Sequence, residues 1–146
     1  MLRAIAGLAG LALCTTLVLA QNTGAIEQRK QAMKAMGGAL KEPGAMAKGE
    51  GAFDLAKVQA SLKSLQADAS KLKALWPEDS KTGGNTRALP AIWTNMKDYL
   101  DWFDGLANDA KAAEASIKDE ASFKAAWPNI TDYCGSCHKD FRAPSK

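Results

Sequence analysis

Histidine and strand-forming patterns are both scarce in this sequence. The 146 residues include one histidine, His138, and β-branched residues are few beside Ala, Lys, Leu, Asp and Glu. Apolar and polar residues seldom alternate with a period of two, which disfavours β-strands. The sequence also lacks a phosphate-binding loop, a nucleophile next to a base, and paired carboxylates placed with a histidine. We therefore expect an all-helical protein that is not an enzyme.

Neither sign of charge is in large excess. The chain has 19 basic and 16 acidic side chains, a formal net charge of +3, and the two signs are interspersed along it. A nucleic-acid surface needs clustered cations. We therefore expect no nucleic-acid partner.

A long apolar run occurs only at the N-terminus. Arg3 precedes a run over residues 4–19 that is shorter than the about 20 apolar residues of a membrane span. We interpret residues 1–20 as a secretory signal peptide, cleaved near Ala20, and residues 21–146 as one exported domain. The alternatives are a transmembrane anchor and a lipoprotein site. We expect a periplasmic protein without stable membrane insertion.

Helical periodicity marks four segments of the exported part. They are residues 23–41, residues 55–75 after an Asp54 cap, a helix that begins at Pro90, and residues 119–142 with a local kink at Pro128. Pro43-Gly44 should kink or end the first, and residues 80–87 should form a polar loop. Four amphipathic helices with mostly short connections predict an antiparallel four-helix bundle.

The strongest motif is Cys134-Gly135-Ser136-Cys137-His138. Positions i, i+3 and i+4 of a helix share one face. Both thiols can therefore bond to one edge of a porphyrin while His138 turns its imidazole to the iron. The pattern is typical of covalent haem attachment. A redox-active cysteine pair, a zinc site or a chance match are the alternatives.

Because His138 is the only histidine, two histidines of one chain cannot both ligate the iron. The second face of the iron must therefore be open or occupied by another group. Thioether sulfur is a suitable ligand for an electron-transfer haem. The methionines available after residue 20 are Met33, Met36, Met46 and Met96.

The chain resembles the class II cytochromes c, the family of cytochrome c′ and its low-spin relatives. The resemblance rests on four segments in order: Arg29 to Gly37 with Met33-Lys34, Ala47-Lys48-Gly49-Glu50, Pro90-Ala91-Ile92-Trp93, and Cys134 to Arg142. It covers essentially all of residues 21–146. It implies a four-helix cytochrome domain with one haem c per chain, attached near the C-terminus.

The resemblance also implies two possible functions. In low-spin members a methionine at the position of Met33 ligates the iron, whereas in cytochrome c′ an apolar residue there crowds an open site. We favour His138 and Met33 as axial ligands of an electron carrier, with Met36 as the second choice. The alternative is a five-coordinate haem that binds a small gas such as nitric oxide. A haem-free thiol or metal-binding bundle is a third hypothesis.

By the same resemblance, Arg29 approaches a haem propionate, unless it is only a solvated charge on the helix. Arg87 is a weaker candidate for the same role. Lys139 and Arg142 are candidates for docking an acidic redox partner, whose identity the sequence does not give. A homodimer is expected by analogy alone.

Overall fold

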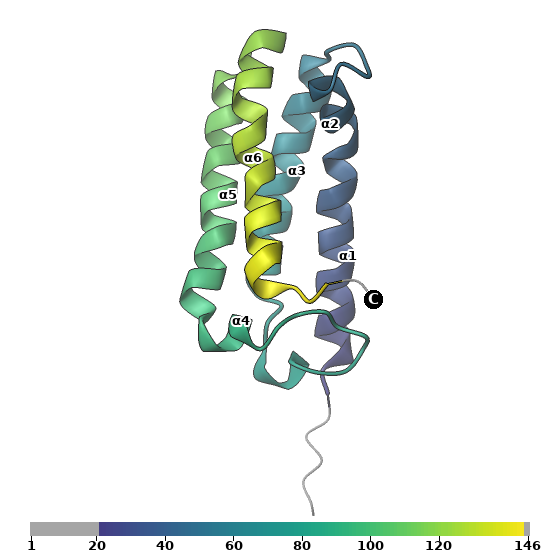
Figure 1. Ribbon diagram of the computed structural model, residues 1–146, viewed down its shortest axis with the longest axis vertical. Coiled ribbons are helices and arrows are strands. Elements are labelled where there is room, and N and C mark those ends of the chain that lie inside the picture. The colour runs from purple at the N-terminus through teal and green to yellow at the C-terminus, as the bar shows by residue number, and fades with distance from the viewer. Residues whose placement is uncertain (1–20, 145–146) are drawn as a thin grey trace, which may run out of the picture.

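The computed structural model describes residues 21–144, so the leader predicted for residues 1–20 lies outside the described part. Four long helices run antiparallel and are joined by shorter elements (Figure 1). The elements are α1 (Thr23–Ala39), α2 (Lys41–Ala47), α3 (Leu55–Leu72), η1 (Glu78–Ser80), α4 (Ala91–Thr94), α5 (Met96–Ser116) and α6 (Glu120–Phe141). The predicted all-α, antiparallel four-helix bundle is confirmed.

Two of the long helices begin at the aspartates that the sequence indicates. The Asp54 side chain accepts a hydrogen bond from the Lys57 N–H at 3.1 Å. Asp119 accepts one from the Ser122 N–H at 2.8 Å, and the Ser122 hydroxyl in turn bonds the Asp119 backbone as a capping box. These bonds satisfy N–H groups that have no partner within the helix, which fixes where α3 and α6 start.

Three helix boundaries differ from the prediction. The first helix breaks at Leu40 and resumes as α2, where Pro43 lies in the first turn and so removes no intrahelical hydrogen bond. The helix expected from Pro90 is divided at Asn95, whose φ of −125° and ψ of 43° are not helical. The second helix ends at Leu72, three residues early, whereas α6 continues through Pro128.

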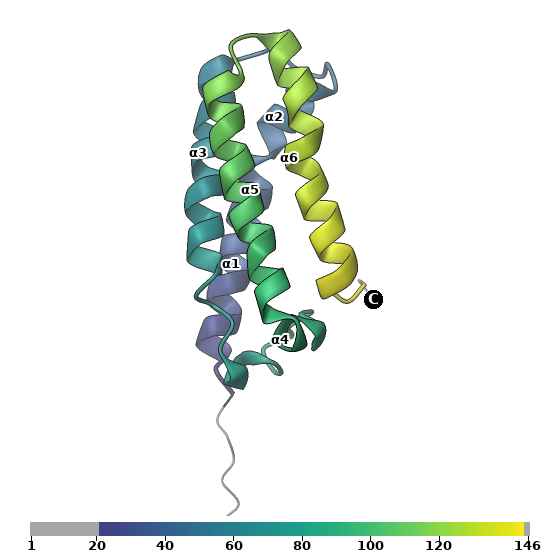
Figure 2. The same ribbon diagram turned by 90° about the vertical axis from the view of Figure 1, so that its left-hand side faces the viewer.

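The bundle is packed most continuously between α3 and α5. Figure 2 looks onto α5, with α3 on one side and α6 on the other. The apolar stripe of α3 is fully buried from Val58 to Leu72, and α1 packs on the other flank of α3. Among the described helices, none is both long and apolar enough to cross a membrane. The opposite side, where α1 faces α6, holds the candidate site.

A candidate haem pocket between α1 and α6

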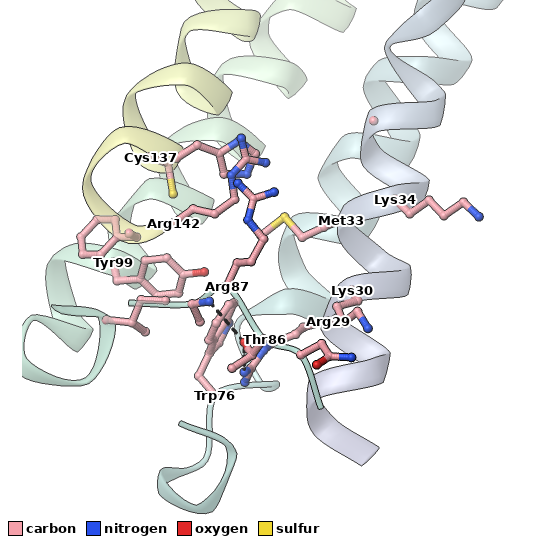
Figure 3. Close-up of a pocket in the computed structure, with 16 residues that line it drawn as sticks. Arg29, Lys30, Met33, Lys34, Trp76, Thr86, Arg87, Tyr99, Cys137 and Arg142 are labelled. Atoms are coloured by element: carbon pink, nitrogen blue, oxygen red, sulfur yellow. Dashed lines mark hydrogen bonds between the residues drawn. The ribbon is translucent and has the colours of Figure 1, made fainter. Parts of the chain in front are cut away.

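A cavity of about 510 Å³ lies between α1 and α6 (Figure 3). A second cavity of about 140 Å³ adjoins it, because Met33, Gly37, Cys137 and His138 line both. The larger volume falls in the range of about 300–1,000 Å³ that is usual for small-molecule and cofactor sites. Cys134 lines the smaller cavity. All three side chains of the cysteine–histidine motif therefore face this space.

Helix α6 holds the motif in a fixed orientation. Cys137 is buried, and Cys134 and His138 are half-buried. The end of the helix is tied to the loop before α4: the Leu89 N–H donates to the Phe141 carbonyl at 3.0 Å, and the Ala143 N–H donates to the Arg87 carbonyl at 2.8 Å. These bonds form a short antiparallel bridge that closes one end of the larger cavity.

The haem-free interpretations of the motif fit the geometry poorly. Cys134 and Cys137 are both free thiols. Burial raises the pKa of Cys137 to about 11 and also raises the pKa of Cys134. Redox-active cysteine pairs have a lowered pKa. Within residues 21–144 no group of three His, Cys, Asp or Glu side chains is arranged to hold a metal ion.

His138 is held in the form that ligates metals. Burial lowers its pKa, and the cationic side chains of Arg142 and Arg87 lower it further. The neutral imidazole keeps a lone pair free for a metal. Because His138 comes from α6, a ligand on the far side of a bound ring must come from another wall of the cavity.

Met33 provides that opposite wall. Its side chain extends from α1 into the cavity, and it is half-buried (Figure 3). Met36, the second candidate ligand, is 7% exposed and belongs to the apolar core, although it also lines the smaller cavity. Met33 is therefore the methionine that faces both cavities.

Arg29 is buried, so its interpretation as a solvated charge is wrong. It is 3% exposed and lies in the wall of the larger cavity. Its terminal nitrogens donate to the Ser80 hydroxyl at 2.8 Å, the Ser80 carbonyl at 2.7 Å, the Thr86 hydroxyl at 2.9 Å and, more weakly, the Leu75 carbonyl at 3.4 Å. Its guanidinium lies 4.7 Å from the centroid of the Trp76 ring. Burial lowers its pKa, yet arginine stays charged.

The other candidate cations lie at or near the rim. Arg87 is exposed, and its Nε and one terminal nitrogen both donate to the Ala143 carbonyl, at 2.9 and 2.6 Å. Arg142 is exposed and contributes to the cavity wall. Lys139 is exposed on α6 and is not part of that wall.

Two cavity residues were missed as site residues. Trp76 directly follows the second predicted helix and Tyr99 lies in the helix expected from Pro90, yet both line the larger cavity. A tyrosine or tryptophan in an apolar stripe carries a polar group that needs a partner. That property is the signal in the sequence that could have found them.

The cavity fits a haem. The wall of the cavity offers apolar and aromatic surface for a large ring, from Trp76, Ile92, Tyr99 and Phe141. Buried Arg29 offers a positive charge for the carboxylates of such a ring. The motif lies along α6 for two covalent links and one ligand. These three features occur together in one cavity.

Comparisons with known proteins agree with this fit. A family model described as "Cytochrome C'" matches residues 24–142. A protein named cytochrome c′ from Rhodopseudomonas palustris is 49% identical over 139 residues, which cover 95% of each chain. A cytochrome c-556 from Agrobacterium fabrum is 34% identical over 131 residues, covering 89% of this chain and 87% of that one.

Solved structures are similar over the same region. The structure of cytochrome c′ from Rhodopseudomonas palustris has a TM-score of 0.82 and 51% identity, and covers 84% of this chain and 98% of that chain. The oxidised cytochrome c556 of the same species has a TM-score of 0.76 and 29% identity, with the same coverage.

Proposed function

This chain belongs to the cytochrome c′ family, whose members carry one covalently attached haem c, and we propose that it is an exported haem protein that binds a small gas such as nitric oxide. In this proposal residues 1–20 direct export to the periplasm and residues 21–146 form the cytochrome domain. The haem iron supplies the coordination and redox chemistry. The roles below belong to the side chains of the chain.

We assign haem attachment to Cys134 and Cys137 and the iron ligand to His138. The supporting observation is that all three side chains, on one face of α6, line the two adjoining cavities. Buried Arg29 balances the charge of a haem carboxylate in this assignment. Its four bonded N–H groups leave only Nε free to donate directly, so its role is mainly electrostatic.

We further propose that the second face of the iron is open and that Met33 packs over it. The observation that carries this choice is the 49% identity to a protein named cytochrome c′, against 34% to a cytochrome c-556. This preference reverses the one that the sequence favoured. Methionine is flexible and fills irregular apolar space well, so its presence beside a haem does not require a bond to iron.

A second candidate is an electron carrier in which Met33 and His138 both ligate the iron. The specific observation in its favour is that Met33 faces the same cavity as His138 from the opposite helix. Because two strong ligands would bind the iron in both oxidation states, electron transfer would need little structural reorganisation. Neither candidate requires substrate turnover, and the redox partner and a homodimer remain predictions.

Electron paramagnetic resonance and visible absorption at neutral pH separate the two candidates. With an open face, the wild-type haem is high-spin in both oxidation states and takes up one nitric oxide per haem. Met33→Ala then leaves the spin state unchanged and speeds gas entry. Met96→Ala is the matched control, because Met96 lies at the start of α5 and lines neither cavity.

The opposite result identifies the electron carrier. A low-spin wild-type haem that becomes high-spin in Met33→Ala, with no change in Met96→Ala, makes Met33 a ligand and overturns the open-face proposal. A low-spin haem that stays low-spin in Met33→Ala means that a group other than Met33 is the ligand.

A further inference from the structure

Tyr99 is a polar side chain buried in an aromatic cluster. It is 1% exposed, and its ring makes T-shaped contacts with Trp76 at 4.7 Å, Phe141 at 4.8 Å and Phe103 at 5.2 Å between centroids. These contacts explain why an aromatic ring occupies this place on α5. They do not explain the hydroxyl, because a phenylalanine would bury the same ring without a polar atom.

The Tyr99 hydroxyl makes no hydrogen bond to any residue between 21 and 144, whereas the hydroxyl of Tyr133 donates to Asp109 at 2.8 Å. Figure 3 shows that the Tyr99 hydroxyl points into the larger cavity, toward the side from which Met33 extends. Polar groups in protein interiors are almost always hydrogen-bonded, so a hydroxyl that faces a cavity without a protein partner is placed to bond what the cavity holds.

Few of the groups that line the cavity could accept this hydrogen bond, and the two side chains with a further acceptor, Asn85 and His138, are not bonded to the Tyr99 hydroxyl. Arg29 and the indole of Trp76 carry only donors. The Thr86 hydroxyl already accepts from Arg29 and from the Ala88 N–H, at 2.9 and 3.2 Å. No carboxylate is among the residues that line the cavity. A molecule that fills the cavity can therefore supply the acceptor that Tyr99 lacks in the protein.

The hydroxyl keeps its proton at neutral pH. Burial raises the pKa of Tyr99, the nearby Cys137 raises it further, and Arg29 lowers it by less. Tyr99 lines the same cavity as Cys137, on the side of the covalent links, and Arg29, on the side assigned to the carboxylates. It is therefore a neutral donor between these two sides of the cavity.

We propose that the Tyr99 hydroxyl donates a hydrogen bond to an oxygen acceptor that enters the cavity with the haem, either a haem carboxylate or a diatomic gas on the open face of the iron. A hydrogen bond to the gas rests on the proposed function, whereas a hydrogen bond to the carboxylate is possible with either spin state of the haem. With a carboxylate as the acceptor, the Tyr99 hydroxyl orients the haem through that carboxylate. With the gas as the acceptor, it helps to select the bound gas.

The test compares wild type, Tyr99→Phe and Tyr133→Phe as haem-loaded proteins. Resonance Raman of the gas-free ferric form follows the carboxylate bending band, and infrared of the nitric oxide form follows the N–O stretch. If the acceptor is a carboxylate, only the bending band shifts in Tyr99→Phe. If it is the gas, the N–O stretch shifts and nitric oxide leaves about 5- to 10-fold faster, as expected for the loss of one hydrogen bond.

Tyr133→Phe controls for the loss of a hydroxyl that already has its own partner. Because the chain has two tyrosines, this variant also leaves Tyr99 as the only one, so ultraviolet resonance Raman reports directly whether its hydroxyl is a donor. Unchanged carboxylate and N–O bands in a folded Tyr99→Phe protein overturn the proposal, because the hydroxyl then meets only water. If wild type binds no nitric oxide, the open-face function fails, and the carboxylate band still decides the role of Tyr99.

Discussion

The two sides of the bundle are built differently. Between α3 and α5 the core is apolar and closed: Val58, Leu62, Leu65, Ala69 and Leu72 are all 0% exposed. Charges at the edge of this side are paired, as in Lys73–Asp104 at 2.6 Å and Lys63–Glu114 at 3.5 Å. Between α1 and α6 there are instead two cavities, and α1 buries only Ile26, Arg29 and Met36.

The difference suggests that the α3–α5 side mainly stabilises the fold and that the α1–α6 side mainly binds the cofactor. The α3–α5 side is complete without a cofactor, because its apolar residues already contact one another. The α1–α6 side presents aromatic surface and a buried cation to a cavity, so it gains contacts only when a large ring fills it. We therefore expect the cofactor to stabilise the two sides unequally.

The largest expected effect comes from removing both tethers. Cys134→Ala/Cys137→Ala protein, made in a host that matures c-type cytochromes, should carry no covalent haem. Its Tm should fall by about 10 °C or more, the equivalent of a few kcal/mol. Hydrogen exchange should lose protection first in α1 and α6, while α3 and α5 retain it. A melt as high and as sharp as wild type would contradict the unequal stabilisation.

A smaller effect tests the closed side. Leu65→Ala removes a fully buried side chain of α3, and it should cost about 2–5 kcal/mol of unfolding free energy in urea titration. The visible spectrum of the bound haem should not change, because Leu65 lines neither cavity. A spectral change in this variant would mean that the α3–α5 core and the haem pocket are not independent.

The regular parts of the fold could be predicted from local chemistry. The Asp54 and Asp119 caps and the stripe of α3 are signals confined to one turn or one helix face, and they lead to the correct bundle. The division at Asn95 could not be predicted, because no proline or glycine marks it. Its non-helical backbone between α4 and α5 depends on how that corner packs.

The candidate site also has a part that local sequence predicts and a part that depends on tertiary packing. Cys134, Cys137 and His138 are neighbours on one helix, so their joint position follows from spacing alone. Tyr99 and Trp76 reach the cavity from other elements, and the position of each depends on the tertiary packing. The sequence shows that these residues carry a hydroxyl and an indole N–H, but not that the indole N–H of Trp76 is buried without a hydrogen-bond partner among residues 21–144.

Charge is the clearest case of a pattern that only the fold creates. Acidic and basic residues are interspersed along the chain, and from this we expected no nucleic-acid partner. The structure nevertheless brings five cations and no carboxylate into the wall of the larger cavity: Arg29, Lys30, Lys34, Arg87 and Arg142. Two haem carboxylates would leave a positive rim, although Lys30 also pairs with Glu27.

That rim yields the smallest of the predicted effects. Arg142→Glu reverses an exposed charge at the cavity wall, so oxidation of the ferrous haem by the anion hexacyanoferrate(III) should slow several-fold at low salt and recover toward wild type above about 0.5 M salt. Lys111→Glu makes the same charge change on an exposed site of α5 that does not line the cavity. Stopped-flow rates normalised for the measured midpoint potentials should fall for Arg142→Glu alone. Equal slowing in both variants would show that net charge, and not the rim between α1 and α6, attracts the anion.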